Sequence, residues 1–249
     1  MCSETWKSTA RTVCTDLIDL VWPRFCALCT TSLEPPDLDR CLCAECRTTL
    51  LGDTRESCPR CSSTVGPHTD VSKGCPRCKN LKFHFSGVTR LGEYDARLRV
   101  AILWMKQERG ELLAERVGEL FAVERRTKLL ASNPDVIVPI PLHWLRRWKR
   151  GYDQAAAIAG GLASELRYEC WPGTLVRTRP TEHQAGLSAS ARWENVRGAF
   201  RLSRFARVQG KRVLLVDDVL TTGATADAAT QVLLSAGAAQ VSVAVLAHR

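Results

Sequence analysis

The amino-acid sequence predicts an α/β fold: a parallel sheet flanked by helices, preceded by a small cysteine-rich domain. Three observations lead to this fold class. All but one of the twelve cysteines lie before residue 80. From Phe83 onward, apolar β-rich runs alternate with segments of helical periodicity, which is the pattern of a parallel sheet with right-handed crossovers. A chain of 249 residues, 45% of them hydrophobic, can bury the core of one ordinary domain beside a small one.

The cysteines form four Cys-x-x-Cys pairs, and the pattern C-x₂-C-x₁₃-C-x₂-C occurs twice. Each pair directs two sulfurs at one centre, and two pairs complete a tetrahedral thiolate site. We therefore expect two structural zinc ions (Zn²⁺). The expected ligands are Cys26, Cys29, Cys43, Cys46, Cys58, Cys61, Cys75 and Cys78. The spacing allows sequential pairing, which gives two stacked zinc ribbons, and it also allows interleaved pairing.

A disulfide framework and a redox site are the alternatives for these cysteines. We expect no secretion signal, because Leu17–Trp22 is short and is broken by Asp19. Zinc is therefore favoured over disulfides. A thiol–disulfide oxidoreductase usually has one Cys-x-x-Cys pair on an α/β scaffold rather than four in a loop-rich segment. Closed four-thiol sites have no open coordination position, so the expected role of zinc is to fold this segment.

The elements of the second part follow from periodicity and from glycine and proline breaks. Gly110 separates two helical segments, Pro134 precedes a strand, and Gly237 fits the C-cap of the last helix. The expected strands are Phe85–Leu91, Asp135–Ile140, Leu175–Arg177, Val213–Val216 and Val241–Leu246. The expected helices are Ala96–Gln107, Glu111–Lys128, Asp153–Leu166 and the segment from about Ala224 to Ser235.

Residues 213–229 contain the candidate ligand site. Val213–Val216 is apolar and β-branched, as in a strand buried on both faces. Asp217 and Asp218 therefore lie near its carboxyl end, where open α/β sheets bind ligands. The loop that follows consists of Thr221, Thr222, Gly223, Ala224 and Thr225. Its backbone N–H groups and three hydroxyls at a helix N-terminus form an anion cradle, and two carboxylates beside such a cradle suit a sugar phosphate.

The same residues also allow a purely structural interpretation, in which they form a buried strand, an Asp-rich turn and a capped helix. Adjacent carboxylates repel one another unless something binds them, but a solvated turn tolerates them. The string is not a Walker A loop, because it lacks Gly-Lys-Ser/Thr, and it is not a G-x-G-x-x-G dinucleotide turn.

Two long segments between the strands hold further candidate residues. Pro139–Gln154 follows a strand and precedes a helix, so we expect its cations at the same sheet end as the carboxylates, where they could neutralise a pyrophosphate. These cations are Arg146, Arg147, Lys149 and Arg150. The alternatives are a solvated basic helix cap with Trp144 and Trp148 packed beneath it, and contact with nucleic acid. Arg177–Phe200 is long and polar, as in a lid or binding loop.

The composition changes near Phe83 and divides the chain into an N-terminal helix (1–22), a double zinc-ribbon domain (23–82) and the α/β domain (83–249). The formal net charge is +9, and it falls to about +5 if each four-thiolate zinc site carries about −2. This basic excess suits a phosphorylated substrate as well as it suits DNA. No stretch of 18 apolar residues occurs, so we expect no membrane insertion and a cytoplasmic protein.

The Asp217–Thr225 string strongly resembles the phosphoribosyl pyrophosphate (PRPP) motif of type I phosphoribosyltransferases. From Leu20 to Leu246 the chain resembles the ComF family, the competence-associated branch of that superfamily. The resemblance rests on the Cys-x-x-Cys pairs after Trp22-Pro23, on Lys106 in a Trp-Met-Lys run, on Val138–Pro141 with Arg150–Gln154, and on Arg177, Arg179, Thr181, Gln184, Arg192 and Asn195. One position departs from the pattern: Asp153 stands where family members commonly have Asn.

The resemblance implies a type I phosphoribosyltransferase-like fold and a role for each matching residue. Asp217 and Asp218 would be the catalytic pair and hold the ribose hydroxyls of a PRPP-like ligand, and Thr221–Thr225 would hold its 5′-phosphate. The Arg150 segment would face the pyrophosphate, Arg177–Asn195 would be a mobile lid, and Mg²⁺ would bridge pyrophosphate and ribose oxygens. Thr221–Thr225 is called the phosphate loop below. The implied substrate-binding residues outside it are Lys106, Arg150, Gly151, Gln154, Gln184, Arg192 and Asn195.

Two functions from different classes fit these residues. The first is a phosphoribosyltransferase that transfers phosphoribosyl from PRPP to an acceptor that the sequence does not name. The second is a non-catalytic module that binds single-stranded DNA or a 5′-phosphate and aids DNA uptake with a competence helicase, in line with the family resemblance and the basic charge. Salvage-related regulation, with PRPP as a signal, is a third function, but no feature of the sequence is specific to it.

Overall fold

The computed structural model describes residues 25–33, 41–179 and 188–249. The expected N-terminal helix (1–22) lies outside these residues. The chain divides into two compact units, Met1–Thr49 and Leu50–Arg249, and each unit is described by itself. The boundaries of the three expected domains stay predictions.

The first unit consists of short segments that bring four cysteines together. The N–H of Cys26 donates to the carbonyl of Thr31 (2.8 Å), which closes the first Cys-x-x-Cys turn. The N–H of Ala27 donates to the carbonyl of Cys41 (3.0 Å), so the first turn is tied to the segment that holds the second pair. The second pair leads into α2 (Ala44–Leu51).

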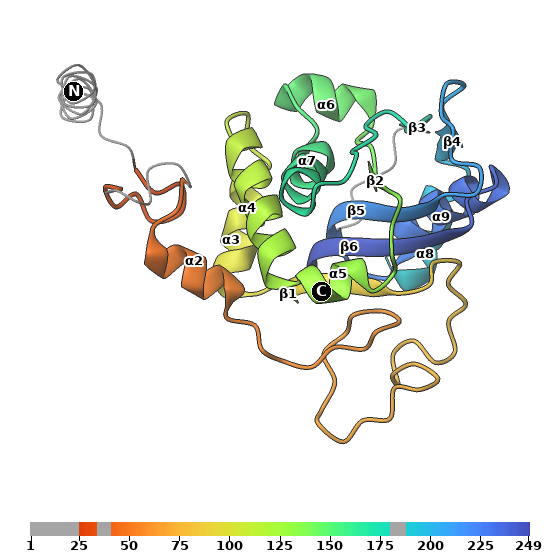
Figure 1. Ribbon diagram of the computed structural model, residues 1–249, viewed down its shortest axis with the longest axis horizontal. Helices are drawn as coiled ribbons and strands as arrows, with labels where there is room; N and C mark the ends of the chain where they lie inside the picture. The colour runs from red at the N-terminus through yellow and green to blue at the C-terminus, as the bar shows by residue number, and fades with distance from the viewer. Residues whose placement is uncertain (1–24, 34–40, 180–187) are drawn as a thin grey trace, which may run out of the picture. The chain divides into compact units, whose positions relative to one another are not determined.

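A four-stranded parallel sheet forms the centre of the second unit (Figure 1). Its order is β1 (Val88–Glu93), β6 (Gln240–His248), β5 (Arg212–Leu220) and β2 (Val136–Pro139), and every pairing is parallel. The predicted parallel sheet is therefore confirmed. β5 is a central strand, and Val213–Val216 is buried without a break because helices cover both faces of the sheet.

The helices of this unit are α3 (Ala96–Trp104), α4 (Glu111–Glu124), α5 (Arg126–Leu130), α6 (Trp144–Arg150), α7 (Gln154–Leu166), α8 (Ala189–Val196) and α9 (Ala224–Ser235). Figure 1 shows α4 and α7 on one side of the sheet and α9 on the other. Val213 and Leu215 of β5 share a buried cluster with Ala229 and Leu233 of α9. None of the helices in the described part of the chain has the length and apolar character that a membrane span requires.

Several details differ from the sequence prediction. The first strand, β1, covers Val88–Glu93 and not Phe85–Leu91. The expected helix over 111–128 is interrupted at Arg125, whose φ of −113° and ψ of 21° separate α4 from α5. The short strand β3 (Leu175–Arg177) lies outside the parallel sheet and pairs antiparallel with β4 (Phe200–Leu202), which the sequence did not predict. The basic segment Pro139–Gln154, for which no helix was predicted, contains α6. β5 continues to Leu220, so Asp217 and Asp218, here called the acid pair, lie within the strand.

Candidate functional site

The acid pair lies close to the carboxyl end of β5. The carboxylate of Asp217 accepts a hydrogen bond from the N–H of Asp218 (2.9 Å), and the carboxylate of Asp218 accepts one from the N–H of Val219 (2.7 Å). Both aspartates are partly exposed. The carboxyl end of a central parallel strand is a place where open α/β sheets bind ligands, so both carboxylates can contact one.

The electrostatics of the pair favour added positive charge. Burial raises the pKa of Asp217 well above its ordinary value, and the negative charge of Asp218 raises it further, while the charge of Arg177 opposes the rise. Nζ of Lys106 lies 3.0 Å from Oδ2 of Asp218. The protein's own cations therefore do not fully neutralise the two carboxylates, and a cation or a hydrogen-bond donor from a ligand would stabilise them.

The loop after β5 turns sharply into α9. Gly223, at the N-cap of α9, has a φ of +81°, which lies in the left-handed region that favours glycine. The Ala224 N–H donates to Oγ1 of Thr222 (3.4 Å), and the Asp227 N–H donates to the carbonyl of Gly223 (2.8 Å). The partly exposed residues of the loop are Thr221, Thr222 and Thr225. The positive end of the α9 dipole thus follows the acid pair directly, as an anion site requires.

Lys106 is positioned through its neighbour Met105. The buried Tyr152 donates from its hydroxyl to the carbonyl of Met105, and Nε2 of the buried Gln154 lies 3.8 Å from Sδ of Met105. Nη1 of Arg150 donates to Oε1 of Gln154 (3.4 Å). The structure therefore brings Lys106, Arg150 and Gln154, three residues that the family resemblance implies in substrate binding, into one group of contacts.

Asp153, the position that departs from the family pattern, is the N-cap of α7. Its Oδ1 accepts from the N–H of Ala156 (3.3 Å), and its Oδ2 accepts from the N–H of Leu142 (2.9 Å). Burial raises the pKa of this carboxyl above its ordinary value. The side chain thus ties the start of α7 to the segment before α6, which is a structural role that an amide oxygen also supports in part.

The short helix α6 presents its two tryptophans to solvent. Trp144 is 65% exposed and Trp148 is 83% exposed, so the alternative in which both rings pack beneath a basic cap is wrong. The helix begins after His143, whose Nδ1 accepts from the N–H of Leu145 (3.4 Å), and it ends at Gly151, which has a φ of +79°. The four cations of the segment lie between and beside these exposed rings.

A cavity of about 620 Å³ lies beside α6, α7 and the end of β2. Its lining includes Arg147, Gly151, Tyr152, Asp153 and Arg177. Arg177, whose charge lowers the pKa of Asp217, is part of this lining, whereas Asp217 and Asp218 are not. Its volume is in the range of small-molecule sites.

The polar segment 177–200 is described only in part, and Gln184 lies outside the described residues. Arg192 and Asn195 lie in α8, and Ser188 caps the N-terminus of that helix. α8 packs against α9. The two family-motif residues therefore lie on a helix that packs against α9, the helix that follows the phosphate loop.

Each unit holds, in its described residues, one group of four cysteines whose sulfurs lie within 4.8 Å of one another. The groups are Cys26, Cys29, Cys43 and Cys46, and Cys58, Cys61, Cys75 and Cys78. The pairs therefore combine sequentially. Sγ of Cys29 lies 3.6 Å from Sγ of Cys43, and Sγ of Cys61 lies 3.6 Å from Sγ of Cys75. A tetrahedral site with Zn–S bonds of about 2.3 Å needs a sulfur spacing of about 3.8 Å, so both groups fit zinc.

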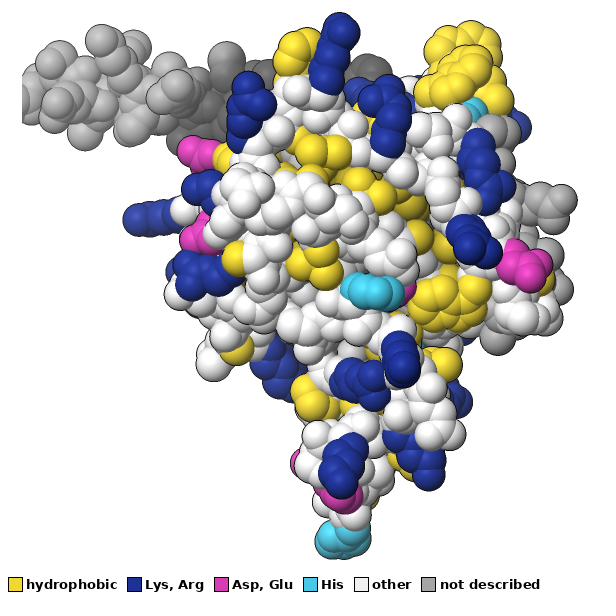
Figure 2. Space-filling model, turned by 90° about the vertical axis from the view of Figure 1, so that its right-hand side faces the viewer, with side chains coloured by type: hydrophobic (Ala, Val, Ile, Leu, Met, Phe, Trp, Pro, Cys, Tyr) yellow, Lys and Arg dark blue, Asp and Glu magenta, His cyan; other side chains and the backbone are white. Residues whose placement is uncertain are grey.

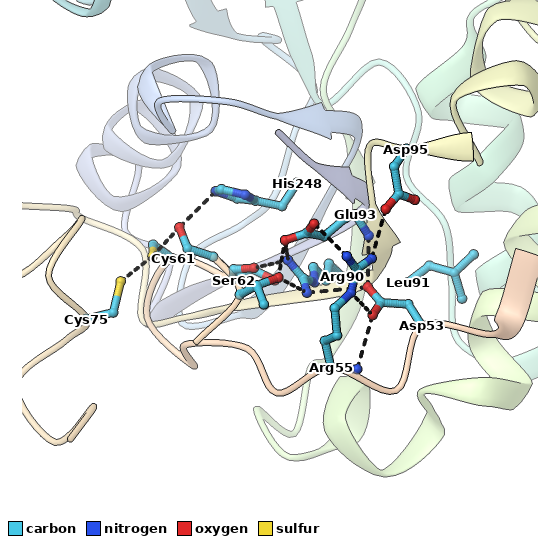
Figure 3. A network of polar contacts seen from close by, with 12 residues as sticks. Asp53, Arg55, Cys61, Ser62, Cys75, Arg90, Leu91, Glu93, Asp95 and His248 are labelled. Atoms are coloured by element: carbon cyan, nitrogen blue, oxygen red, sulfur yellow. Dashed lines mark hydrogen bonds and ion pairs between the residues drawn. The ribbon is translucent and has the colours of Figure 1, made fainter. Parts of the chain in front are cut away.

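The second cysteine group is linked to the sheet by a polar network (Figure 3). Sγ of Cys61 lies 3.3 Å from Oγ of Ser63, and this hydroxyl lies 3.2 Å from Nε2 of the buried His248. His248 ends β6 and pairs in register with Leu220, the last residue of β5. Contacts of this kind orient metal ligands, and here they reach β6, the strand next to the one that holds the acid pair.

Arg90 of β1 is the centre of the same network (Figure 3). Its buried guanidinium donates to the carbonyl of Ser62 (2.8 Å) and to Oγ1 of Thr64 (2.7 Å). It also lies 3.3 Å from Oδ2 of Asp53 and 3.5 Å from Oε1 of Glu93. Burial lowers the pKa of Arg90, and these acceptors offset the cost of burying its charge. The loop that holds Cys61 is thereby fixed to the sheet.

Sequence reasoning missed Phe83 and His84, two residues that lie against the phosphate loop and α9. The ring of Phe83 contacts Gly223, and the N–H of His84 donates to Oδ1 of Asp227 (2.6 Å). The only local signal was their place directly after the last cysteine pair. Contacts between segments so distant in the chain leave no spacing pattern, and reasoning from motifs does not find them.

Four similarities to known proteins and families bear on the site. The phosphoribosyl transferase domain family matches residues 106–249. The DNA utilization protein YhgH of Escherichia coli (strain K12) is 37% identical over 157 residues, which cover 61% of this chain and 68% of that protein. Competence protein F of Haemophilus influenzae is 36% identical over 111 residues, 44% of this chain and 48% of that protein. An orotate phosphoribosyltransferase of Rhodopseudomonas palustris is 35% identical over 97 residues, 38% of this chain and 46% of that protein. These similarities confirm the resemblance drawn from the sequence motifs.

Proposed function

Because this chain belongs to the phosphoribosyl transferase domain family, we propose that it binds PRPP or a similar phosphoribosyl ligand at the carboxyl end of β5. The observation that carries the proposal is the position of Asp217 and Asp218 near the end of β5, one short loop before the N-terminus of α9, with Lys106 3.0 Å from Asp218. The carboxylates accept hydrogen bonds from hydroxyls, and the helix N-terminus donates to phosphate. A phosphoribosyl group presents both chemistries a few ångströms apart.

Each part of the site then has one task. The N–H groups and hydroxyls of Thr221–Thr225 bind the 5′-phosphate, and Asp217 and Asp218 accept hydrogen bonds from the ribose hydroxyls. Lys106 and Arg150 face the pyrophosphate. The carboxylate oxygens of the pair suit Mg²⁺, a hard cation that would supply charge neutralisation to the pyrophosphate when bound.

The same geometry supports transfer of the phosphoribosyl group to an acceptor. The bond between C1 of the ribose and the pyrophosphate oxygen breaks, pyrophosphate leaves with the bonding electron pair, and a lone pair of the acceptor forms the new bond to C1. The acid pair stabilises the positive charge that develops on the ribose, and the nearby cations stabilise the leaving group. Catalysis of this kind consists of positioning and charge stabilisation. The acceptor is not assigned.

Calorimetric titration with PRPP, with and without Mg²⁺, tests the proposal. We expect the wild type to bind PRPP in the presence of Mg²⁺, and the double variant Asp217→Asn/Asp218→Asn to lose at least tenfold in affinity. The matched control is Asp135→Asn, which makes the same chemical change at the opposite end of β5, where Asp135 pairs with Arg212 (2.7 Å). Wild-type protein without PRPP binding in either condition contradicts the proposal, as does a double variant that binds like the wild type.

We also propose that each four-cysteine group holds one zinc ion with a structural role. Four thiolates complete the coordination of zinc, so no position is open for a substrate. Two zinc ions per chain are the expected result of metal analysis on reduced, folded protein.

A second candidate function is binding of single-stranded DNA, and the exposed rings of α6 favour it. Trp144 and Trp148 stand one helical turn apart among four cations, and bases stack on such rings while cations contact phosphates. Figure 2 shows Lys and Arg side chains spread over one face and gathered on its lower projection, which is the second cysteine-rich segment in Figure 1. The exposed cations of that segment are Lys73, Arg77, Lys79 and Lys82.

Gel retardation of a labelled single strand separates this function from ligand binding. We expect Trp148→Ala to weaken retardation severalfold and Arg146→Ala/Arg147→Ala to weaken it and to reduce its salt dependence. Phe205→Ala is the matched control, since Phe205 is a 75% exposed ring outside α6. Absence of retardation by the wild type at low salt argues against this function. The competence helicase and the cytoplasmic location stay predictions from the sequence.

A further inference from the structure

Phe83 occupies a position between the second cysteine group and the phosphate loop. Its partly buried side chain packs against the buried cluster of Cys58, Cys61, Cys75 and Cys78, and it also packs against the core cluster of the sheet. Among the described residues, it is the one apolar side chain that borders both clusters. Phe83 therefore links a metal-binding segment to the fold that holds the candidate ligand site.

The edge of the Phe83 ring contacts the turn of the phosphate loop. A Cβ atom added at Gly223 would lie 2.9 Å from Cε1 and 3.4 Å from Cζ of this ring. Gly223 also has a positive φ of +81°. The backbone conformation of Gly223 and the neighbouring ring of Phe83 together restrict the turn. A shift of the ring would change the space available to the loop.

The faces of the same ring are occupied as well. Phe85 stacks on Phe83 with a centroid distance of 4.6 Å and an interplanar angle of 17°, and Trp193 of α8 stacks at 6.3 Å and 20°. The guanidinium carbon of Arg60, from the second cysteine segment, lies 5.8 Å from the ring centroid. Stacked aromatic pairs stabilise a structure beyond the effect of the area that they bury. The ring thus holds α8, the cysteine segment and the loop against one another.

The next residue fixes the helix that follows the loop. The His84 N–H donates to Oδ1 of Asp227 (2.6 Å), and Nδ1 of its imidazole lies 3.0 Å from Oδ2 of the same carboxylate. Asp227 is 1% exposed and lies in the first turn of α9. Nε2 of Gln231 also donates to this carboxylate (2.8 Å). Phe83 therefore contacts the loop turn at Gly223, and His84 contacts the first turn of α9, the helix whose N-terminal N–H groups form the anion cradle.

We propose that Phe83 is a positioning residue for the 5′-phosphate of the ligand, acting through Gly223. The proposal rests on the proposed function and adds a residue to it. The ring fixes the turn so that the N–H groups of the loop point to one place before the phosphate arrives, which lowers the cost of ordering them on binding. A smaller, flexible side chain at this position leaves the turn free to move away from that arrangement.

Calorimetry with ribose 5-phosphate and, separately, with pyrophosphate tests this role. We expect Phe83→Leu to weaken binding of ribose 5-phosphate about tenfold and to change the affinity for pyrophosphate by less than twofold. The matched control is Phe121→Leu, the same substitution in a fully buried ring of α4 that lies outside the clusters bordered by Phe83. We expect this control to lower Tm at least as much as Phe83→Leu and to leave the affinity for ribose 5-phosphate within twofold.

The outcomes separate this inference from the proposed function. If the wild type binds neither ribose 5-phosphate nor PRPP, the proposed function fails. If the wild type binds ribose 5-phosphate and Phe83→Leu binds it equally well, the positioning role fails while the proposed function stands. Equal losses for both ligands, or equal losses in the Phe83 and Phe121 variants, indicate a general structural role and overturn the inference.

Discussion

Nζ of Lys106 lies 3.0 Å from Oδ2 of Asp218, although Lys106 follows α3 and Asp218 lies on β5. The side chains are 32% and 20% exposed. An ion pair between partly exposed groups contributes at most about 1 kcal/mol to stability. The main consequence of the contact is therefore its effect on the site. It places a cation beside the acid pair, where a pyrophosphate would bind.

Replacing Lys106 tests whether that cation takes part in ligand binding. We expect Lys106→Met to lower the affinity for PRPP at least tenfold, because a charge-assisted contact to phosphate is lost, and to change the free energy of unfolding by less than about 1 kcal/mol. Arg109→Met is the control, since Arg109 is an exposed cation three residues further along the chain. If calorimetry gives the same loss of PRPP affinity for both variants, Lys106 acts through general electrostatic attraction and not through a direct contact with the ligand.

Asp153 predicts a pH dependence of stability. Burial raises its pKa in the folded state above the ordinary value of 3.8, so the folded protein holds this proton to a higher pH than the unfolded chain does. The contribution of the group to stability is therefore present at low pH and is lost as the pH rises from about 4 through the raised pKa. An asparagine at position 153 does not titrate, so it makes no such pH-dependent contribution to stability.

Urea unfolding at pH 4, 5.5 and 7 measures this effect against Asp153→Asn, with zinc content determined at each pH. The stability of the wild type minus that of the variant is expected to decrease as the pH rises. A difference that is constant, or that increases toward pH 7, is the result that would count against a buried, proton-holding Asp153.

Two adjacent glycines of α7 are expected to respond in opposite ways to alanine. A Cβ at Gly161 would lie 2.0 Å from the carbonyl oxygen of Glu115 in α4, whereas at Gly160 no such atom lies within 4 Å. We expect Gly161→Ala to destabilise the protein by about 3 kcal/mol, because two helix backbones must separate. Gly160→Ala should stabilise it by about 0.5–1 kcal/mol through helix propensity. Thermal unfolding that moves both variants in the same direction would contradict the close contact of α4 and α7.

Removing one thiol from each cysteine group is expected to have unequal consequences. Both Cys29→Ser and Cys61→Ser should reduce zinc from two ions per chain to one, as measured by elemental analysis. Cys61 is linked through Ser63 to His248, and its group borders Phe83, so Cys61→Ser should also weaken binding of ribose 5-phosphate. If Cys29→Ser weakens it to the same degree, the link between the second metal site and the phosphate loop is wrong.

Local pattern was enough to predict much of the sheet and of the acid-pair loop. The apolar run Val213–Val216 indicated a strand buried on both faces, and Gly223 marked the turn into a helix whose predicted bounds agree with α9. These features depend on neighbouring residues, whose periodicity and backbone preference the sequence displays directly.

Features that depend on distant contacts were not predictable in the same way. A seven-residue helix with Trp144 and Trp148 one turn apart does not show which face is turned inward, and both rings are exposed. The contact between Phe83 and Gly223 joins segments from the two ends of the α/β unit. The position of Lys106 came from family resemblance alone, because no local pattern relates it to Asp218.

The central claim is that the loop after β5 binds the 5′-phosphate of a phosphoribosyl ligand, and amide NMR with ribose 5-phosphate tests it most directly. The largest chemical-shift changes are expected at the amides of Gly223, Ala224 and Thr225, because these N–H groups would donate to the phosphate. The changes should saturate with the same affinity that calorimetry gives. Saturating ribose 5-phosphate that leaves these three amides unchanged, or that shifts only amides elsewhere in the chain, would contradict the claim.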